Sequence, residues 1–291
     1  MDYVIHLLTI IAIFSLLAVS LDLLIGNCGL LSITHAAFAA IGAYASAIMT
    51  TKLGWPVIGG VFVGVLCAGA LSTLLAYSAL RLSGDTFAVA TFGFHIILYR
   101  IFENWTELTG GPLGLAGIPP LTSSSILINS ALIIFISMAG IYVLNKIRFS
   151  TFGLALRLIR DDEVFAQSVG KHVVKSKTIA VVIGSVFAAI AGSLYAHHFS
   201  YIDAPSFSML DSIMIVCMVI IGGAASRWGG VVGAAIIILT PEALRFLGFP
   251  PSVAAIIKLA LFGLLLVCVA RWWPTGLMRA RPSFQSDAVK Y

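Results

Sequence analysis

Long apolar stretches separated by short polar segments constrain this chain more than any other feature of its sequence. The nine stretches cover roughly 3–25, 31–50, 56–80, 84–103, 124–146, 177–199, 207–223, 227–245 and 252–272. A helix needs about 20 mostly apolar residues to cross a bilayer. Only 10% of the residues are charged, against about a quarter in soluble domains. We therefore predict an all-α, polytopic transmembrane bundle of about 8–10 membrane segments, forming one domain over residues 1–291.

Two of these stretches are weaker candidates for a membrane span than the others. The stretch 84–103 carries ionisable residues, and the stretch 227–245 is opened by glycines and interrupted by Pro241 and Glu242. Irregular backbone at membrane depth is tolerated only where protein or a water-filled cavity satisfies it. Either stretch could therefore be tilted, broken or re-entrant.

The main polar interruption is the segment 146–177, which lies between two blocks of apolar sequence. It holds seven of the chain's seventeen Lys and Arg residues and all of its clustered carboxylates. Ser150 or Thr151 can cap a first short helix, and Asp161 or Asp162 can cap a second. We predict a pair of short helices here, outside the membrane.

The second helix of this segment is predicted to end at Gly170, a residue suited to a helix C-terminus. Leu158, Phe165 and Val169 form an apolar strip between charged neighbours. Short amphipathic helices suit a groove in a protein or the membrane surface. The three acids at 161–163 disfavour anionic lipid, so we expect a protein partner.

The basic residues also predict how the chain is oriented. If 146–177 is cytosolic, nine crossings place the N-terminus outside and thirteen of the seventeen Lys and Arg residues on the cytosolic side, as expected for membrane proteins. The net charge of +5 then reflects orientation and not affinity for nucleic acid. The tail 273–291 would be cytosolic and the loop 104–123 periplasmic. Glycines and prolines exclude a continuous helix from that loop, which is either a packed plug or a docking rim.

Polar and ionisable side chains within the apolar stretches are candidates for function, because they are costly in a membrane. Ser32, Thr34 and His35 form a polar group at the start of a small-residue helix, where they either line a pathway or fix helix packing. Small residues at four-residue spacing usually serve packing, but Gly229 and Gly233 lie in a weak segment. The candidates for lining a translocation pathway are Ser32, Thr34, His35, Thr91, His95, Gly229 and Gly233.

The sequence contains no recognisable catalytic or cofactor motif. The nearest approach to a phosphate loop is Gly170-Lys171, but His172 follows where the motif requires Ser or Thr. No cysteine pair has metal-ligand spacing, and no nucleophile–base pair is evident. We therefore predict a protein without a cofactor that is not itself an enzyme. Any ATP-derived energy must come from another subunit.

Four blocks of sequence carry a resemblance to a known family. They are 29–38 with 41–44 (GLLSITHAAF and IGAY), 104–115 with 117–119 (NWTELTGGPLGL and GIP), 156–163 with Gly170 (LRLIRDDE), and 222–229 (GGAASRWG). In these blocks the chain resembles the inner-membrane permease family of branched-chain amino acid ABC importers, of the LivM type. The blocks occur in the family's order and span most of the chain.

The resemblance implies a multi-pass subunit of the bacterial inner membrane, surrounded by membrane lipid. It implies four partners: a second homologous permease, two cytosolic ATPase subunits and a periplasmic substrate-binding protein. The segment 146–177 would be the coupling region, seated in a groove of one ATPase. The residues expected to act in coupling are Arg157, Arg160, Asp161, Asp162, Glu163, Phe165 and Gly170.

Two functions from different classes follow from the sequence. The favoured one is import of branched-chain or related hydrophobic amino acids, with urea or short amides as alternative substrates. The rival is a self-sufficient proton-coupled secondary transporter or channel for small solutes. Its proton carriers would be Asp22, His35, Asp211 or Glu242.

Overall fold

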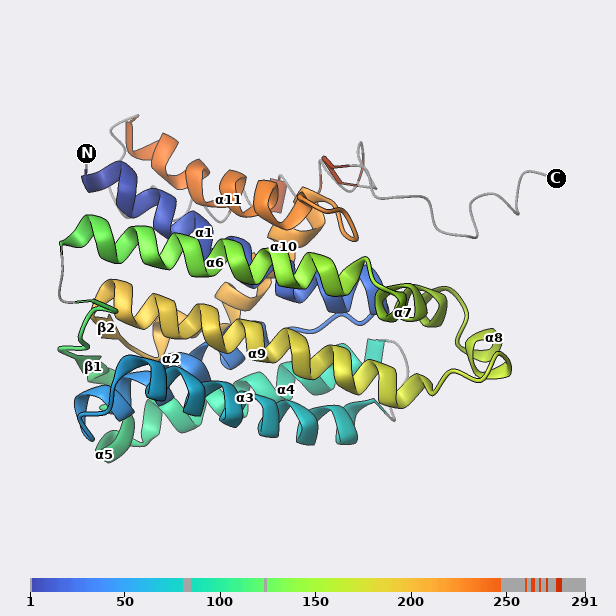
Figure 1. Ribbon diagram of the computed structural model, residues 1–291, viewed down its shortest axis with the longest axis horizontal. Coiled ribbons are helices and arrows are strands. Elements are labelled where there is room, and N and C mark those ends of the chain that lie inside the picture. Colours follow the sequence, from blue (N-terminus) through green and yellow to red (C-terminus); the bar gives the residue numbers. More distant parts are fainter. Residues whose placement is uncertain are drawn as a thin grey trace.

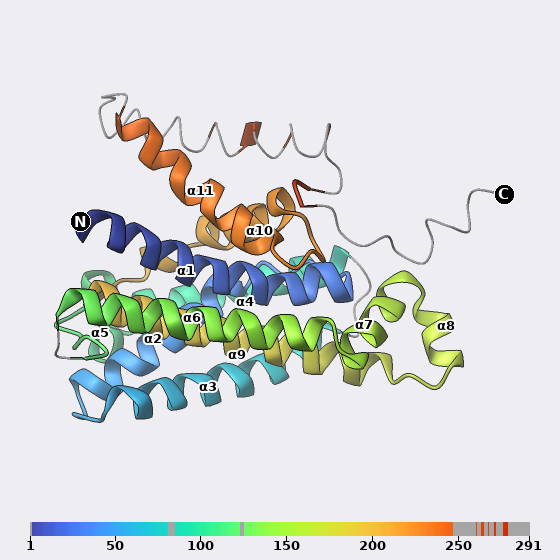
Figure 2. The same cartoon turned by 45° about the horizontal axis from the view of Figure 1, so that its top comes forward.

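The computed structural model of the chain describes residues 2–80, 85–122 and 125–246, together with a few separate positions between 260 and 278. Its long helices lie side by side and form a bundle (Figures 1 and 2). Within the described residues, six helical stretches are long and apolar enough to cross a membrane. The prediction of an all-α polytopic bundle is confirmed.

The long helices follow the predicted apolar stretches, and short helices lie between some of them. They are α1 (Asp2–Asp22), the π-helix η1 (Leu23–Cys28), α2 (His35–Thr51), α3 (Val57–Ala79), α4 (Asp85–Asn104), α5 (Thr106–Thr109), the 3-10 helix η2 (Gly111–Leu113), α6 (Ile126–Arg148), α7 (Thr151–Asp161), α8 (Glu163–Ser168), α9 (Val173–Phe199), the 3-10 helix η3 (Pro205–Phe207), α10 (Met209–Gly222) and α11 (Gly229–Phe246). The stretches 84–103 and 227–245, expected to be weak, form the continuous helices α4 and α11. The predicted stretch 252–272 and tail 273–291 lie outside the described residues, apart from those few positions.

The two polar segments of the chain lie at opposite ends of the bundle. The N-terminus, α5 and the short strands β1 (Leu115–Ala116) and β2 (Tyr201–Ile202) lie at one end, and α7 and α8 at the other (Figure 1). This arrangement agrees with the predicted orientation, in which 104–123 and 146–177 face opposite sides of the membrane. Which end faces the cytosol stays a prediction.

The loop 104–123 is packed against the bundle over its described part. Its strand β1 pairs with β2 in an antiparallel ribbon, with Leu115 opposite Ile202. The Ile118 amide donates to the Ser200 carbonyl at 3.2 Å, and Lys52 Nζ donates to the Leu108 carbonyl at 3.0 Å. The sequence did not predict this short ribbon. The packed arrangement corresponds to the first of the two expected alternatives, and a docking role stays a prediction.

Helix α2 begins inside the bundle and not at its end (Figure 1). After η1 the chain returns toward the middle of the bundle through residues 29–34, of which Ser32 and Thr34 are buried. The helix predicted over 31–50 therefore starts later, at His35. Its first turn lies beside α10, because the Ala36 amide donates to Ser212 Oγ at 3.1 Å.

Small residues let α9 approach α2 closely. Gly192 faces the backbone of Ala39, where a Cβ atom would lie only 2.7 Å from the Ala39 Cα atom. One residue further along α9, Ser193 Oγ donates to the Gly42 carbonyl at 2.9 Å. Lipid gives apolar helices no hydrophobic reason to associate, so close backbone approach and such hydrogen bonds hold them together. Gly192 thus lies on a packing face of α9, which is the role expected of most small residues in membrane helices.

Replacing Gly192 by alanine is expected to destabilise the protein by about 1–3 kcal/mol, because the added methyl group overpacks a contact with rigid backbone. Thermal unfolding of the full-length chain in detergent measures the change. The matched control is Gly93→Ala on α4, where a Cβ atom would meet nothing within 4 Å. Alanine is a better helix former than glycine, so this control should be neutral or stabilising by up to about 1 kcal/mol. Equal shifts in both variants would contradict the close α2–α9 contact.

Candidate functional site

The segment 146–177 folds into the two helices α7 and α8 at the end of the bundle. Ser150 caps α7, its Oγ accepting from the Gly153 amide at 3.5 Å. Asp162 caps α8, its Oδ1 accepting from the Phe165 amide at 2.9 Å. Gly170 follows α8 with a left-handed backbone at φ +79°, and its amide donates to the Gln167 carbonyl at 2.9 Å. The predicted helix pair, caps and stop are present.

Helix α7 is fixed to the end of α1 through Arg160. Its Nη1 donates to the Gly26 carbonyl of η1 at 2.5 Å, and its other guanidinium nitrogens contact the Asp161 carboxylate at 3.0 Å. A free carbonyl near the end of a helix accepts well from a cation. Arg160, expected in coupling, therefore joins α7 to the end of the first membrane helix, and Asp161, also expected there, binds the Arg160 guanidinium.

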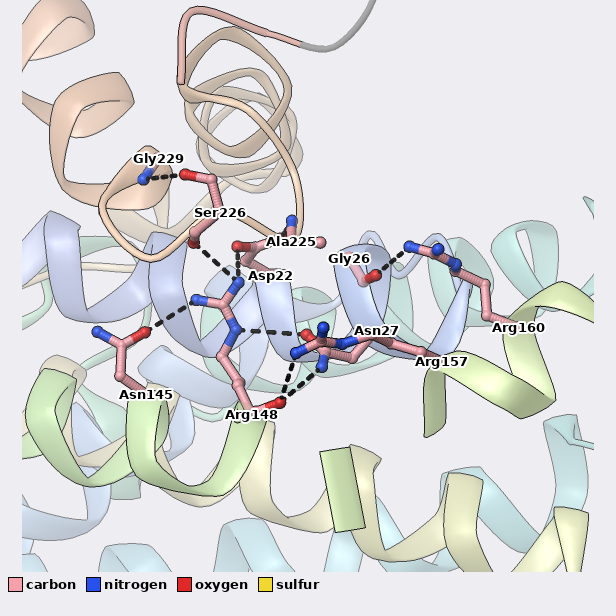
Figure 3. Close-up of polar contacts among 10 residues, drawn as sticks. All are labelled: Asp22, Gly26, Asn27, Asn145, Arg148, Arg157, Arg160, Ala225, Ser226 and Gly229. Carbon is pink, nitrogen blue, oxygen red and sulfur yellow. Dashed lines mark hydrogen bonds and ion pairs between the residues drawn. The ribbon is translucent and has the colours of Figure 1, made fainter. Parts of the chain in front are cut away.

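A second set of contacts, called the Arg148 joint below, is centred on Arg148, the last residue of α6 (Figure 3). Its side chain is fully buried and forms an ion pair with the equally buried Asp22 of α1. Nη2 also donates to the Ser226 carbonyl at 3.1 Å, and Nη1 donates to Asn145 Oδ1 at 3.3 Å. The second carboxylate oxygen of Asp22 accepts from the Ala225 amide at 2.8 Å. One ion pair thus connects α1, α6 and the loop between α10 and α11.

The same joint reaches α7 through the backbone of Arg148. Its carbonyl accepts from Arg157 Nη2 at 3.0 Å and from Asn27 Nδ2 at 3.2 Å. Figure 3 shows both arginines of α7 with their guanidinium groups directed toward η1 and the end of α6. α7 is thus hydrogen-bonded to the residue that also connects α1, α6 and the α10–α11 loop.

Helix α8 presents apolar side chains outward. Val164 is 76% exposed, Phe165 54% and Val169 55%. The prediction that Leu158 shares this strip is wrong, because Leu158 packs against the small inner cluster formed by Ile159, Ala166 and Val173. Glu163, also expected in coupling, forms an ion pair with Lys177 at the start of α9.

Within the bundle, five of the predicted pathway residues lie close together. Ser32 Oγ lies 2.9 Å from Thr34 Oγ1, and the Ile33 amide donates to Thr91 Oγ1 at 3.2 Å. His35 Nε2 lies 2.8 Å from Ser20 Oγ of α1.

The cluster extends through Ser212 of α10, whose Oγ lies 3.3 Å from His95 Nδ1. His95 is buried, whereas Arg100 of the same helix is exposed and paired with Glu103. The arrangement therefore joins α1, α2, α4 and α10 by polar contacts at the start of α2. It is compatible with both roles expected for His35, which are lining a pathway and fixing the packing of the helices.

Gly229 and Gly233 lie away from this cluster and are both buried. At Gly233 a Cβ atom would lie 2.7 Å from the Met218 carbonyl carbon, and at Gly229 it would lie 2.8 Å from Ser226 Oγ. Close packing of α11 on α10 is thus enough to explain why glycine stands at both positions. That Gly229 and Gly233 line a translocation pathway stays a prediction. No group of three or more potential metal ligands occurs among the described residues.

Comparison with known proteins decides the family. A family model described as the permease component of the branched-chain amino acid transport system matches residues 3–270. The chain belongs to this permease family. It is 26% identical to the high-affinity branched-chain amino acid transport system permease protein LivM of Escherichia coli K12, over 93% of this chain and 68% of that protein. It is 25% identical to the permease protein LivH of the same organism, over 94% of this chain and 92% of that protein.

Family membership and the six candidate membrane helices make this permease a multi-pass protein of the bacterial inner membrane. Its relatives are permease proteins of transport systems. These findings confirm the resemblance, the fold class and the localisation that the sequence predicts.

Sequence reasoning missed the centre of the permease's polar network. In the sequence, Arg148 is one of the basic residues of the segment 146–177, and nothing links it to Asn27, Asn145 or Ser226. One signal was available. Asp22 and Arg148 each end a long apolar stretch, and the two stretches run toward the same end of the bundle. Isolated opposite charges at one membrane boundary are candidates for a pair.

Proposed function

We propose that this permease is a transmembrane subunit of an ATP-driven importer of branched-chain or related hydrophobic amino acids. The names of its relatives support the substrate class, since LivM and LivH are permease proteins of high-affinity branched-chain amino acid transport systems. Similarity to both proteins also supports pairing with a second homologous permease. Two cytosolic ATPases and a periplasmic substrate-binding protein complete the proposed importer.

The exposed apolar side chains of α8 carry the proposal. α8 projects beyond the ends of the membrane helices (Figure 2), and Val164, Phe165 and Val169 are more than half exposed there. Outside the membrane such a surface favours burial against a protein. The neighbouring acids Asp161 and Asp162 disfavour an anionic lipid surface. A groove on an ATPase subunit accounts for both features.

The contacts of α7 supply a route from that groove to the membrane. In the proposed mechanism, ATP-driven closure of the ATPases displaces α8 and, with it, α7. Arg160 then pulls on the end of α1 through Gly26, and Arg157 acts on Arg148 through its carbonyl oxygen. Switching between two packings of rigid helices is a common form of such transitions. The buried cluster around His35 and Ser212 lies where α1 meets α2, α4 and α10, and it is the proposed part of the pathway.

The rival function, proton-coupled transport by this chain alone, has no specific observation in its favour. Each of its four candidate proton carriers has a structural partner. Asp22 pairs with Arg148, and His35 lies 2.8 Å from Ser20 Oγ. Asp211 completes the cap of α10 by accepting from Ser208, and Glu242 accepts from the Tyr3 hydroxyl.

Co-purification with the ATPase subunits of the same transport system tests the proposal. We expect Val164→Glu with Phe165→Glu to lose the ATPases from the purified complex, because burying each apolar side chain contributes about 1.5–3 kcal/mol. The matched control is Leu113→Glu, an 85% exposed leucine at the other end of the bundle, which should retain them. Full retention by the double variant, or amino acid transport by this chain alone in liposomes, would overturn the proposal.

A further inference from the structure

A cleft lies at the junction between α6 and α7, beside the loop that joins α10 to α11. Its volume is about 550 Å³, and its lining includes Phe149, Ser150, Thr151, Arg157 and Arg227. A second cleft of about 460 Å³ shares Phe149 and Arg227 with the first. Because Phe149 and Arg227 line both, the two clefts are adjacent, and together they are called the groove.

The two halves of this groove differ in chemistry. The half beside α7 is lined by arginines and hydroxyl groups. The half that runs along α6 is lined mainly by larger apolar and aromatic side chains, with Lys146 beside them. Met138 is 44% exposed, Tyr142 69% and Trp228 49%. The groove therefore has a cationic end and an apolar end, and none of the described residues that line it is acidic.

Two cations contact the same aromatic ring at the polar end. The guanidinium carbon of Arg157 lies 5.2 Å from the centre of the Phe149 ring, and that of Arg227 lies 5.1 Å from the same centre. Arg227 is exposed and has no ion pair within the described part of the chain. Like charges held at one ring repel each other, and an anion between them relieves the repulsion.

The groove also lies at the right depth for a lipid. Arg148 ends a candidate membrane span that begins at Ile126, so Arg157 and Arg227 are placed at the membrane boundary. Met138 is ten residues before Arg148 and therefore about 15 Å deeper along α6. The cationic end thus matches the headgroup level and the apolar end the acyl-chain level. A soluble protein partner does not reach that depth.

We propose that this groove binds one anionic phospholipid. Its phosphate lies between Arg157 and Arg227, and an acyl chain follows α6 past Tyr142 to Met138. Basic pockets between membrane helices bind the headgroups of such lipids in this way. Because Arg157 also donates to the Arg148 carbonyl, the bound lipid would contact the joint between α7 and the membrane helices.

Native mass spectrometry of the purified full-length chain, titrated with phosphatidylglycerol or phosphatidylcholine, tests the site. We expect the chain to retain phosphatidylglycerol in preference to phosphatidylcholine, and Arg227→Gln to weaken that retention about fivefold. Met138→Glu should weaken it too, because it places a charge beside the acyl chain. The control Lys175→Gln removes an exposed charge at the same end of the bundle, lines neither cleft, and should leave retention unchanged.

Three results would overturn the proposal. If Arg227→Gln and Lys175→Gln lost equal amounts of bound phosphatidylglycerol, the lipid would be attracted to the basic surface in general and not to this groove. Displacement of the lipid by equimolar sn-glycerol 3-phosphate, with Met138→Glu without effect, would show a site for free phosphate esters. Unchanged lipid retention by Arg227→Gln, together with loss of ATPase subunits from the complex, would assign the arginine to a protein contact.

Discussion

Replacing Arg148 by methionine is expected to lower the free energy of unfolding by about 3–5 kcal/mol, because it leaves a buried carboxylate without its counter-charge. Both partners of the Arg148–Asp22 pair are fully buried. The substitution also removes the donor to the Ser226 carbonyl. Thermal or denaturant unfolding of the full-length chain in detergent measures the loss.

A double variant and an exposed ion pair serve as controls for this prediction. Asp22→Asn combined with Arg148→Met removes both charges and should be more stable than Arg148→Met alone. Arg100→Met breaks the pair with Glu103, in which the arginine side chain is 65% exposed. Exposed pairs contribute about 0–1 kcal/mol, so this control should cost far less. A similar cost for Arg100→Met and Arg148→Met would contradict the assigned burial.

Replacing Arg160 by glutamate is expected to uncouple ATP hydrolysis from uptake while the protein still inserts and assembles. The substitution removes the donor to the Gly26 carbonyl and places a negative charge beside that oxygen. A hydrogen bond from a charged group contributes about 1.5–3 kcal/mol. Since 1.4 kcal/mol is a factor of ten, amino acid uptake per ATP hydrolysed should fall about ten- to a hundredfold. Proteoliposomes containing the assembled importer allow both rates to be measured.

Gly170→Leu should uncouple by a different route, because leucine does not readily adopt the left-handed backbone at φ +79°. The turn between α8 and α9 would then change shape. Two conservative variants are the controls. Arg160→Lys keeps a cationic donor, and Gly170→Asn keeps a residue that tolerates this conformation. Both should retain most of the coupling. Normal uptake per ATP in both Arg160→Glu and Gly170→Leu would rule out α7 and α8 as the coupling element.

Features set by neighbours in sequence could be predicted. Apolar runs of about 20 residues identify the membrane helices, and Ser150, Asp162 and Gly170 identify the ends of α7 and α8. The caps and the stop depend on residues within one or two helical turns, and an apolar run depends on one continuous stretch of sequence. Capping hydrogen bonds and the apolar character of one stretch do not depend on how the rest of the chain is folded.

Features set by distant parts of the chain could not be predicted. Asp22 and Arg148 lie 126 positions apart, and each alone is only a charge at the end of an apolar stretch. Leu158 was assigned to the outer strip because its neighbours are charged, yet it packs inward against Ile159 and its cluster. Local pattern does not say which face of a short helix meets the bundle when both faces carry apolar residues.

The internal start of α2 has a consequence for how the protein is made. The helix has 17 residues, about 25 Å of length, and falls short of the roughly 30 Å hydrocarbon core. The polar groups at its start bond to Thr91 and Ser212, which leave the ribosome later than His35. Unsatisfied backbone groups are not stable in lipid. We therefore expect stable integration of residues 29–51 to wait for synthesis of α4 and α10, so that the order of membrane assembly differs from the order of translation.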